Sequence, residues 1–243
     1  MKKSITVLLA DDHVVVREGF RMVLGAEKDM KVVAEARNGR EAVQLAKKFH
    51  PDVVVMDIAM PLLNGFEATR QILKAVPTTK ILILSAYSDV EYVERVIALG
   101  AAGYLLKESS AEVLSKAIRE AQKGNIFFGS AISKHLEKQN EKLLNPRGLL
   151  KKKNTRLSSR EAEVLQLIAE GKANKQTAAD LGISIKTVEK HRQNAMAKLD
   201  IHDTAGLTRY AIAEGITEIG GASSFKWDAS QLAERPGLSK FGA

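Results

Sequence analysis

The chain has 243 residues, enough for two domains of ordinary size, and 45% of them are hydrophobic. No apolar run approaches the roughly 20 residues that a membrane-spanning helix needs, and the absence of cysteine excludes disulfides and thiolate metal sites. The net charge is +8, but residues 126–155 alone contribute +5, with seven Lys and Arg against two Asp and Glu. The basic excess therefore lies in a connecting segment and does not locate a nucleic-acid surface.

The N-terminal stretch MKKSITVLLADDH resembles a signal peptide only briefly. Its apolar part is short, runs directly into two aspartates and lacks a small-residue cleavage site. We therefore expect a first β-strand here, in a cytoplasmic protein without a membrane partner.

The first half of the chain alternates short apolar runs with segments of helical periodicity. The predicted strands are residues 5–10, 32–36, 53–57, 80–85 and 102–106, and helical segments include residues 14–27, 39–49 and 89–100. This alternation predicts βα units and an α/β domain with a parallel sheet, a flavodoxin-like (βα)5 fold. The third and fourth runs are apolar in their interiors, as expected for central strands covered on both faces.

Regular strand signals end at Gly124, so we expect a first domain at residues 1–124. A basic linker follows at 125–156, with a candidate helix at 130–144. Residues 157–219 have helical patterns only, and four short helices with Ser, Asn or Asp caps predict a small all-α bundle. These helices are expected at residues 157–172, 173–182, 184–199 and 203–215. Residues 220–243 lack periodicity and are expected to form a flexible tail.

Polar side chains gather at the predicted carboxyl ends of the strands. Asp11 and Asp12 follow the first run, Asp57 ends the third, Ser85 ends the fourth and Lys107 follows the fifth. In an open parallel sheet these ends meet at one edge, where ligands bind. Three carboxylates in one crevice repel each other and need a cation, and Mg²⁺ suits carboxylates and water better than zinc does.

This set of residues predicts phosphoryl transfer to a carboxylate. Asp57 would be the nucleophile, the metal and Lys107 would neutralise charge on the phosphoryl oxygens, and Ser85 would donate a hydrogen bond. Taken singly, an Asp at a strand end is more often a cap or turn residue and a Lys is usually just solvated. The prediction of an aspartyl phosphate at Asp57 therefore rests on the joint placement of all five residues.

The motifs DD at 11–12, MDIAMPLLNG at 56–65, LSA at 84–86 and GYLLK at 103–107 resemble the receiver domain of two-component response regulators, over residues 4–124. The resemblance implies that Asp57 takes phosphate from a sensor histidine kinase. It also implies that Asp11, Asp12, Asp57 and the backbone carbonyl of Ala59 hold Mg²⁺. Ser85 and Tyr104 are assigned to switching: the hydroxyl turns toward the phosphate and the ring moves inward behind it.

Two further points concern the neighbours of this site. Many receivers have proline after the lysine, whereas Lys107 precedes Glu108, which leaves the geometry of that peptide bond open. Ala59 and Tyr87 lie near the site in sequence, and we hypothesise that they control water access and so the lifetime of the phosphate.

Within residues 184–199, a step of 100° per residue places Val188, Ala195 and Leu199 on one helix face. The opposite face carries Lys186, Glu189, Lys190, Gln193 and Ala197. A charged face is usually only solvated. The short preceding helix and the turn at Gly182 instead predict a helix-turn-helix whose second helix enters the major groove.

Residues 157–215 resemble the LuxR-type DNA-binding domain, through LSSREAEVLQLIAEG, NK at 174–175 and TVEKHRQNAMAKL. With the receiver in front, the chain is similar to NarL/FixJ-family response regulators. The resemblance implies that base edges are contacted by Glu189, Lys190 and Gln193, and phosphates by Lys175, Lys186, Thr187 and Arg192. Glu189 departs from the basic residue often found there. The resemblance also implies a homodimer on paired DNA half-sites, with residues 203–214 as a candidate contact.

We therefore interpret the chain as a DNA-binding response regulator whose dimerisation, or release of the helix-turn-helix domain, is controlled by phosphorylation of Asp57. It would not be an enzyme beyond assisting its own phosphorylation and dephosphorylation. One alternative is a phosphorylation-independent DNA-binding regulator with a vestigial receiver. The other is a flavodoxin-like protein that binds FMN. The acidic loop DDHVVV disfavours it, because FMN needs a glycine- or hydroxyl-rich phosphate cradle. We expect no organic cofactor.

Overall fold

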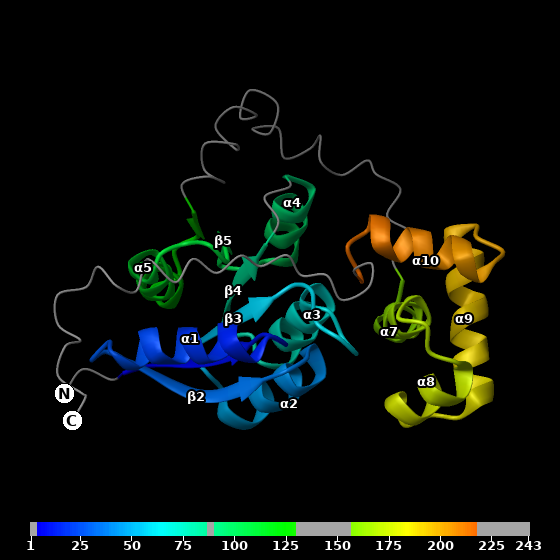
Figure 1. Ribbon diagram of the computed structural model, residues 1–243, viewed down its shortest axis with the longest axis horizontal. Coiled ribbons are helices and arrows are strands. Elements are labelled where there is room, and N and C mark those ends of the chain that lie inside the picture. The colour runs from blue at the N-terminus through cyan, green and yellow to red at the C-terminus, as the bar shows by residue number, and fades with distance from the viewer. Residues whose placement is uncertain (1–3, 87–89, 130–156, 218–243) are drawn as a thin grey trace.

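The computed structural model describes residues 4–86, 90–129 and 157–217. Figure 1 shows an α/β domain built from the first two ranges beside a smaller helical domain built from the third. The strands of the α/β domain are β1 (Ile5–Ala10), β2 (Met30–Ala36), β3 (Val53–Asp57), β4 (Lys80–Ser85), β5 (Gly103–Leu106) and β6 (Phe127–Phe128). Its helices are α1 (Val14–Gly25), α2 (Gly39–Phe49), α3 (Gly65–Ala75), α4 (Val90–Leu99) and α5 (Ala111–Gln122).

The sheet has the strand order β2-β1-β3-β4-β5-β6, and every neighbouring pair is parallel. All five residues of β3 are buried, which confirms that this apolar run is a central strand. The expectation that strands end before residue 125 is wrong. β6 pairs with β5 through Gly103 and Phe127, so the sheet extends past Gly124. A two-residue strand carries no periodicity, so the sequence pattern could not reveal it.

Helices cover both faces of the sheet, and each face has its own core. One core joins the strands to α2, α3 and α4 through residues such as Ala42, Ile72 and Val96. The other joins them to α1 and α5 through Leu24 and Ile118. This double cover leaves the carboxyl ends of the strands as the edge at which polar side chains can gather.

The helical domain consists of α7 (Ser159–Ala169), α8 (Asn174–Leu181), α9 (Ile185–Leu199) and α10 (Thr204–Ala213). Its four helices lie within the four predicted segments, each shortened by one to five residues. Ser158 begins α7 with a capping box to Glu161, and the side chain of Ser184 caps α9 by accepting from the Thr187 amide. Two small cores, around Val164 and Leu165, hold the helices together.

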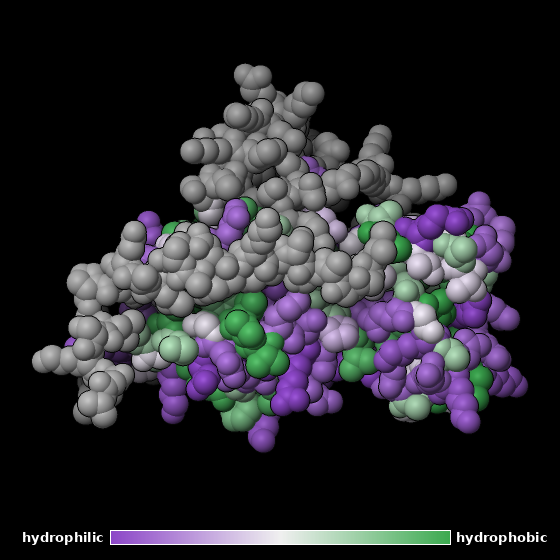
Figure 2. Space-filling model, in the orientation of Figure 1, coloured by the Kyte–Doolittle hydropathy of each residue, from purple (hydrophilic) through white to green (hydrophobic). Residues whose placement is uncertain are grey.

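The two domains are in contact. In Figure 1, α7 lies between the α/β domain and α9, so α9 occupies the outer side of the molecule. Hydrophilic residues predominate along that outer edge of the helical domain in Figure 2. The contact with the α/β domain therefore uses α7, together with Asp180 of α8 and the residues after α10, and leaves the predicted recognition helix on the far side.

Several expectations lie outside the described residues: the candidate helix at 130–144, most of the basic linker, the tail at 220–243 and Tyr87. The domain boundaries stay predictions. Within the described ranges, no helix combines the length and the apolar character needed to cross a membrane.

Candidate functional site

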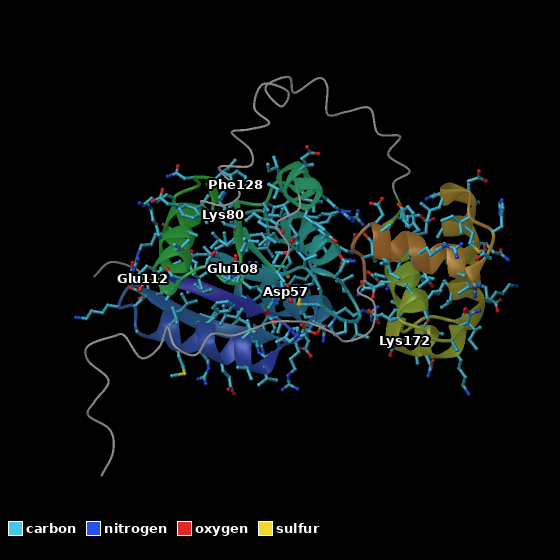
Figure 3. All side chains as sticks on the ribbon, turned by 45° about the horizontal axis from the view of Figure 1, so that its top comes forward. Asp57, Lys80, Glu108, Glu112, Phe128 and Lys172 are labelled. Atoms are coloured by element: carbon cyan, nitrogen blue, oxygen red, sulfur yellow. The ribbon has the colours of Figure 1, made fainter. Side chains whose placement is uncertain are left out.

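The five residues predicted from strand ends do meet at one edge of the sheet. Asp11 follows β1, Asp57 ends β3, Ser85 ends β4 and Lys107 follows β5. The ladder pairs Asp57 with Leu84 and Ser85 with Leu106, so these ends are in register. In Figure 3, Asp57 lies inside the α/β domain, on the side that faces the helical domain.

A buried ion-pair network forms the centre of the site. Lys107 Nζ lies 2.7 Å from Asp57 Oδ2 and 2.9 Å from Asp11 Oδ2. All three side chains are at most 7% exposed. Burying an unpaired carboxylate would cost several kcal/mol, and Lys107 offsets this cost for two carboxylates at once.

A cluster of candidate metal ligands surrounds this network. The ligand atoms of Asp11, Asp12, His13 and Asp57 all lie within 4.8 Å of one another. His13 was not among the predicted site residues. Its Nδ1 lies 2.8 Å from Asp12 Oδ1, and its backbone amide donates to Asp11 Oδ1. The sequence signal was the position of His13 directly after the two aspartates, but periodicity does not tell which way that side chain turns.

Burial and mutual repulsion shift the acidity of the site. Burial, reinforced by the charge of Asp11, raises the pKa of Asp57 to about 7, while Lys107 acts in the opposite direction. Burial also raises the pKa of Asp12. For Lys107 burial lowers the pKa, but the charges of Asp57 and Asp11 outweigh it, and the net pKa is raised. The carboxylates thus hold the lysine in its charged form and compete for it.

The remaining predicted residues of this site flank the network. Ser85 is 1% exposed and Tyr104 is fully buried, so the tyrosine ring already lies inside the domain. Ala59 is partly buried in the loop that follows Asp57. No cis peptide bond occurs among the described residues, so the bond between Lys107 and Glu108, which the sequence left open, is trans.

Arg17 is a further buried charge that the sequence did not single out. Its Nη1 donates to the backbone carbonyl of Asp11 at 2.8 Å, and its Nε pairs with Glu35 at 3.1 Å. In the sequence, Arg17 was one polar residue within a predicted helix. Its partners depend on how α1 packs on the sheet.

The helix-turn-helix geometry is present in the helical domain. Gly182 ends α8 in a left-handed conformation, φ 63°, which favours glycine and turns the chain toward α9. Val188 and Ala195 of α9 are buried. The residues of the opposite face are exposed: Lys186, Glu189, Lys190, Gln193 and Ala197.

Three other predicted DNA contacts have different surroundings. Lys175 is exposed near the start of α8. Thr187 is partly buried, and its hydroxyl lies 2.8 Å from that of Ser184. Arg192 is partly buried and donates to Thr204 Oγ1 at 2.5 Å, so it bridges α9 and α10.

Two family models match the chain. The model of the response regulator receiver domain matches residues 7–119, and that of the bacterial regulatory proteins of the luxR family matches residues 155–211. Together they cover both domains and the carboxylate cluster.

Whole-chain relatives have the same organisation. The oxygen regulatory protein NreC of Staphylococcus aureus is 40% identical over 218 residues, which are 87% of this chain and 99% of that protein. The solved structure of the RcsB response regulator of Salmonella typhimurium has a TM-score of 0.53, 29% identity, and covers 87% of this chain and 99% of its own. A structure of RcsB dimers bound to DNA, also at 29% identity and a TM-score of 0.53, covers 86% and 98%.

Proposed function

Because the chain belongs to the DNA-binding response regulators of two-component systems, which join a receiver to a LuxR-type domain, we propose that Asp57 is its phosphoacceptor. The observation that carries the proposal is the contact of Lys107 Nζ with Asp57 Oδ2, 2.7 Å long, at the buried end of β3. Family membership also removes the FMN-binding alternative.

In the proposed reaction, a carboxylate oxygen of Asp57 attacks the phosphorus of the donor. The bond from phosphorus to the donor breaks, and its electron pair leaves with the donor atom, so that an aspartyl phosphate forms. Lys107 donates to Oδ2, which makes Oδ1 the candidate nucleophile. The charge of Lys107 also offsets negative charge on the phosphoryl oxygens. The protein thereby assists its own phosphorylation.

The donor set fits a hard divalent cation, because three carboxylates contribute oxygens that lie within 4.8 Å of one another. Mg²⁺ would be held by Asp11, Asp12, Asp57 and the backbone carbonyl of Ala59. When bound, it supplies positive charge beside the phosphoryl oxygens. Burial, and after it the charge of Asp11, raises the pKa of Asp57, and this supports the assignment because a bound cation would favour the charged carboxylate against both effects.

Phosphorylation would be sensed by Ser85 and Tyr104. The Ser85 hydroxyl lies at the end of the strand next to Asp57, so it can turn toward a phosphate there. Tyr104 is on the following strand and is already buried, so its role is to pack behind the displaced Ser85. A sensor histidine kinase would supply the phosphoryl group.

In the DNA-binding domain, α9 would enter the major groove of double-stranded DNA. Glu189, Lys190 and Gln193 are the proposed base readers, and the acidic Glu189 suits the amino group of cytosine. The proposed phosphate contacts, which orient the protein without reading sequence, are Lys175, Lys186, Thr187 and Arg192. By analogy with the DNA-bound RcsB dimers, this chain would bind half-sites as a homodimer, with α10 as a candidate contact.

The test compares wild-type protein and Asp57→Asn, each with and without acetyl phosphate and Mg²⁺, on a duplex selected from a random pool by the wild-type protein. We expect acetyl phosphate with Mg²⁺ to strengthen DNA binding by the wild type and to leave Asp57→Asn unchanged. A mobility shift on a phosphate-binding gel reports the phosphorylation itself. Equal DNA affinity under all four conditions would refute the switch and favour the phosphorylation-independent regulator.

A further inference from the structure

A single buried side chain of the DNA-binding domain holds the loop that follows the phosphoacceptor. Gln166 of α7 is 1% exposed. Its Oε1 accepts from the backbone amide of Asn64 at 2.8 Å and from Asn64 Nδ2 at 3.2 Å. Its Nε2 donates to the backbone carbonyl of Met60 at 2.9 Å. Gln166 thus binds both halves of the loop at residues 58–64, which we call the β3–α3 loop.

The tip of the β3–α3 loop is also held by the DNA-binding domain. The backbone amide of Leu62 donates to Glu170 of α7 at 3.2 Å. The Leu62 side chain packs against the core that contains Val164 and Leu167. Leu62 has a left-handed backbone, φ 67°, which is unfavourable for a residue with a side chain. These contacts keep the loop in that conformation.

The same loop belongs to the phosphorylation site. It begins directly after Asp57 and contains Ala59, the proposed backbone ligand of Mg²⁺, whose carbonyl is next along the chain to the Met60 carbonyl that Gln166 binds. The loop has little slack, because the amide of Gly65 donates back to the carbonyl of Ile58 at 2.8 Å. A shift of the Ala59 carbonyl therefore has to move a carbonyl that α7 is holding.

The contact between the two domains does not cover the face of α9 that is proposed to bind DNA. With both domains in contact, Lys186, Glu189, Lys190 and Gln193 are exposed, and α9 lies on the outer side of the molecule in Figure 1. In this arrangement the receiver does not mask the recognition helix. If contact between the domains controls the protein, it has to act through the receiver segments that the DNA-binding domain contacts, and the β3–α3 loop is one of them.

We propose that Gln166 is a positioning residue for the phosphorylation site, supplied by the DNA-binding domain, and that it holds the β3–α3 loop in its unphosphorylated geometry. The inference rests on the proposed function, in which phosphorylation of Asp57 alters the hold on the DNA-binding domain. Coupling between two sites is reciprocal in binding free energy. If a phosphoryl group at Asp57 weakens the binding of α7 to the β3–α3 loop, then the binding of α7 to that loop weakens the binding of a phosphoryl group at Asp57.

The test measures the affinity of full-length protein for beryllofluoride, a phosphoryl analogue, at a fixed Mg²⁺ concentration. Gln166→Leu removes the polar contacts at similar side-chain size. Asn64→Asp weakens the same contact through a substitution in the receiver. It keeps the oxygen that caps α3 at the Glu67 amide and places a second oxygen against Gln166. Gln44→Leu, on the exposed side of α2, is the matched control.

We expect both contact variants to bind beryllofluoride at least fivefold more tightly than the wild type, with the control unchanged. Small-angle scattering of both variants should show a larger share of molecules with separated domains than in the wild type before the ligand is added, because the remaining contacts, such as that of Leu62 with Glu170, are weakened but not removed. If Gln166→Leu does not fold, the affinity of Asn64→Asp for beryllofluoride alone tests the inference. If the wild type binds the analogue but Asn64→Asp binds it equally or more weakly, the inference is wrong and the proposed function stands. If the wild type does not bind it at Asp57, both are wrong.

Discussion

Binding of Mg²⁺ to the receiver should strengthen as the pH rises from 6 to 8, because Asp57 has to lose its proton to become a ligand. Burial and the charge of Asp11 raise the pKa of Asp57 to about 7. At this pKa, roughly one Asp57 in eleven is ionised at pH 6 and about ten in eleven at pH 8. The apparent dissociation constant for Mg²⁺ should therefore fall about tenfold across this range.

Isothermal titration at pH 6, 7 and 8 measures this dependence. Repeating the pH 6 titration in buffers of different ionisation enthalpy should show that close to one proton is released per ion bound. Asp57→Asn should bind Mg²⁺ with an affinity that changes little with pH. His13→Asn changes the one side chain of the cluster that is not a carboxylate, so it is the control and should retain the dependence. A pH-independent affinity in the wild type, or full dependence in Asp57→Asn, would refute the reasoning.

The same pKa has a consequence for stability without metal. A carboxyl whose folded-state pKa is raised above its unfolded value binds more protons in the native state between about pH 4 and 7. The contribution of Asp57 to stability is therefore lost as the pH rises through this window. Asp57→Asn should accordingly raise the melting temperature in Mg²⁺-free buffer at pH 8, and by less at pH 5.

One further substitution in each domain tests a close contact: Gly65→Ala in the receiver and Glu161→Gln in the DNA-binding domain. Gly65→Ala should destabilise the receiver by on the order of 1–3 kcal/mol or more, since its new Cβ would lie 2.0 Å from the Asp57 carbonyl oxygen. Gly25→Ala, whose Cβ would meet nothing within 4 Å, should be neutral, and equal melting temperatures for the two would contradict the argument. Glu161→Gln should cost about 1 kcal/mol at pH 7. It loses an ion pair of 2.6 Å with Lys198. Burial raises the pKa of Glu161, but hydrogen bonds from Lys198 and Ser158 together outweigh burial, so the net pKa is lowered. Because the pKa of Glu161 is lower in the folded state than in the unfolded state, the stability that Glu161 contributes is lost as the pH falls. The difference in stability between Glu161→Gln and the wild type should therefore shrink in acid, and a difference that persists there would contradict this explanation.

The sequence by itself determined most of the elements and the gathering of polar side chains at the strand ends. The run at 53–57 is apolar up to its last residue, so it had to be a central strand that carries Asp57 to the edge of the sheet. Strand ends in a parallel sheet converge, and that rule alone placed Lys107 within reach of Asp57 and Asp11. Likewise the 100° periodicity of residues 184–199 separated the buried face of α9 from the presented one.

Only the tertiary structure decided which polar groups became partners across the fold. Gln166 is one polar residue in the apolar stretch VLQLIA. Its partners Met60 and Asn64 lie more than 100 positions away in the chain. Arg17 and His13 gained their roles in the same way, through the packing of α1 and the turn before it. Periodicity is a local property that fixes which face of an element is buried. The docking of one finished surface on another depends on shape and hydrogen-bond complementarity, and no local pattern encodes that.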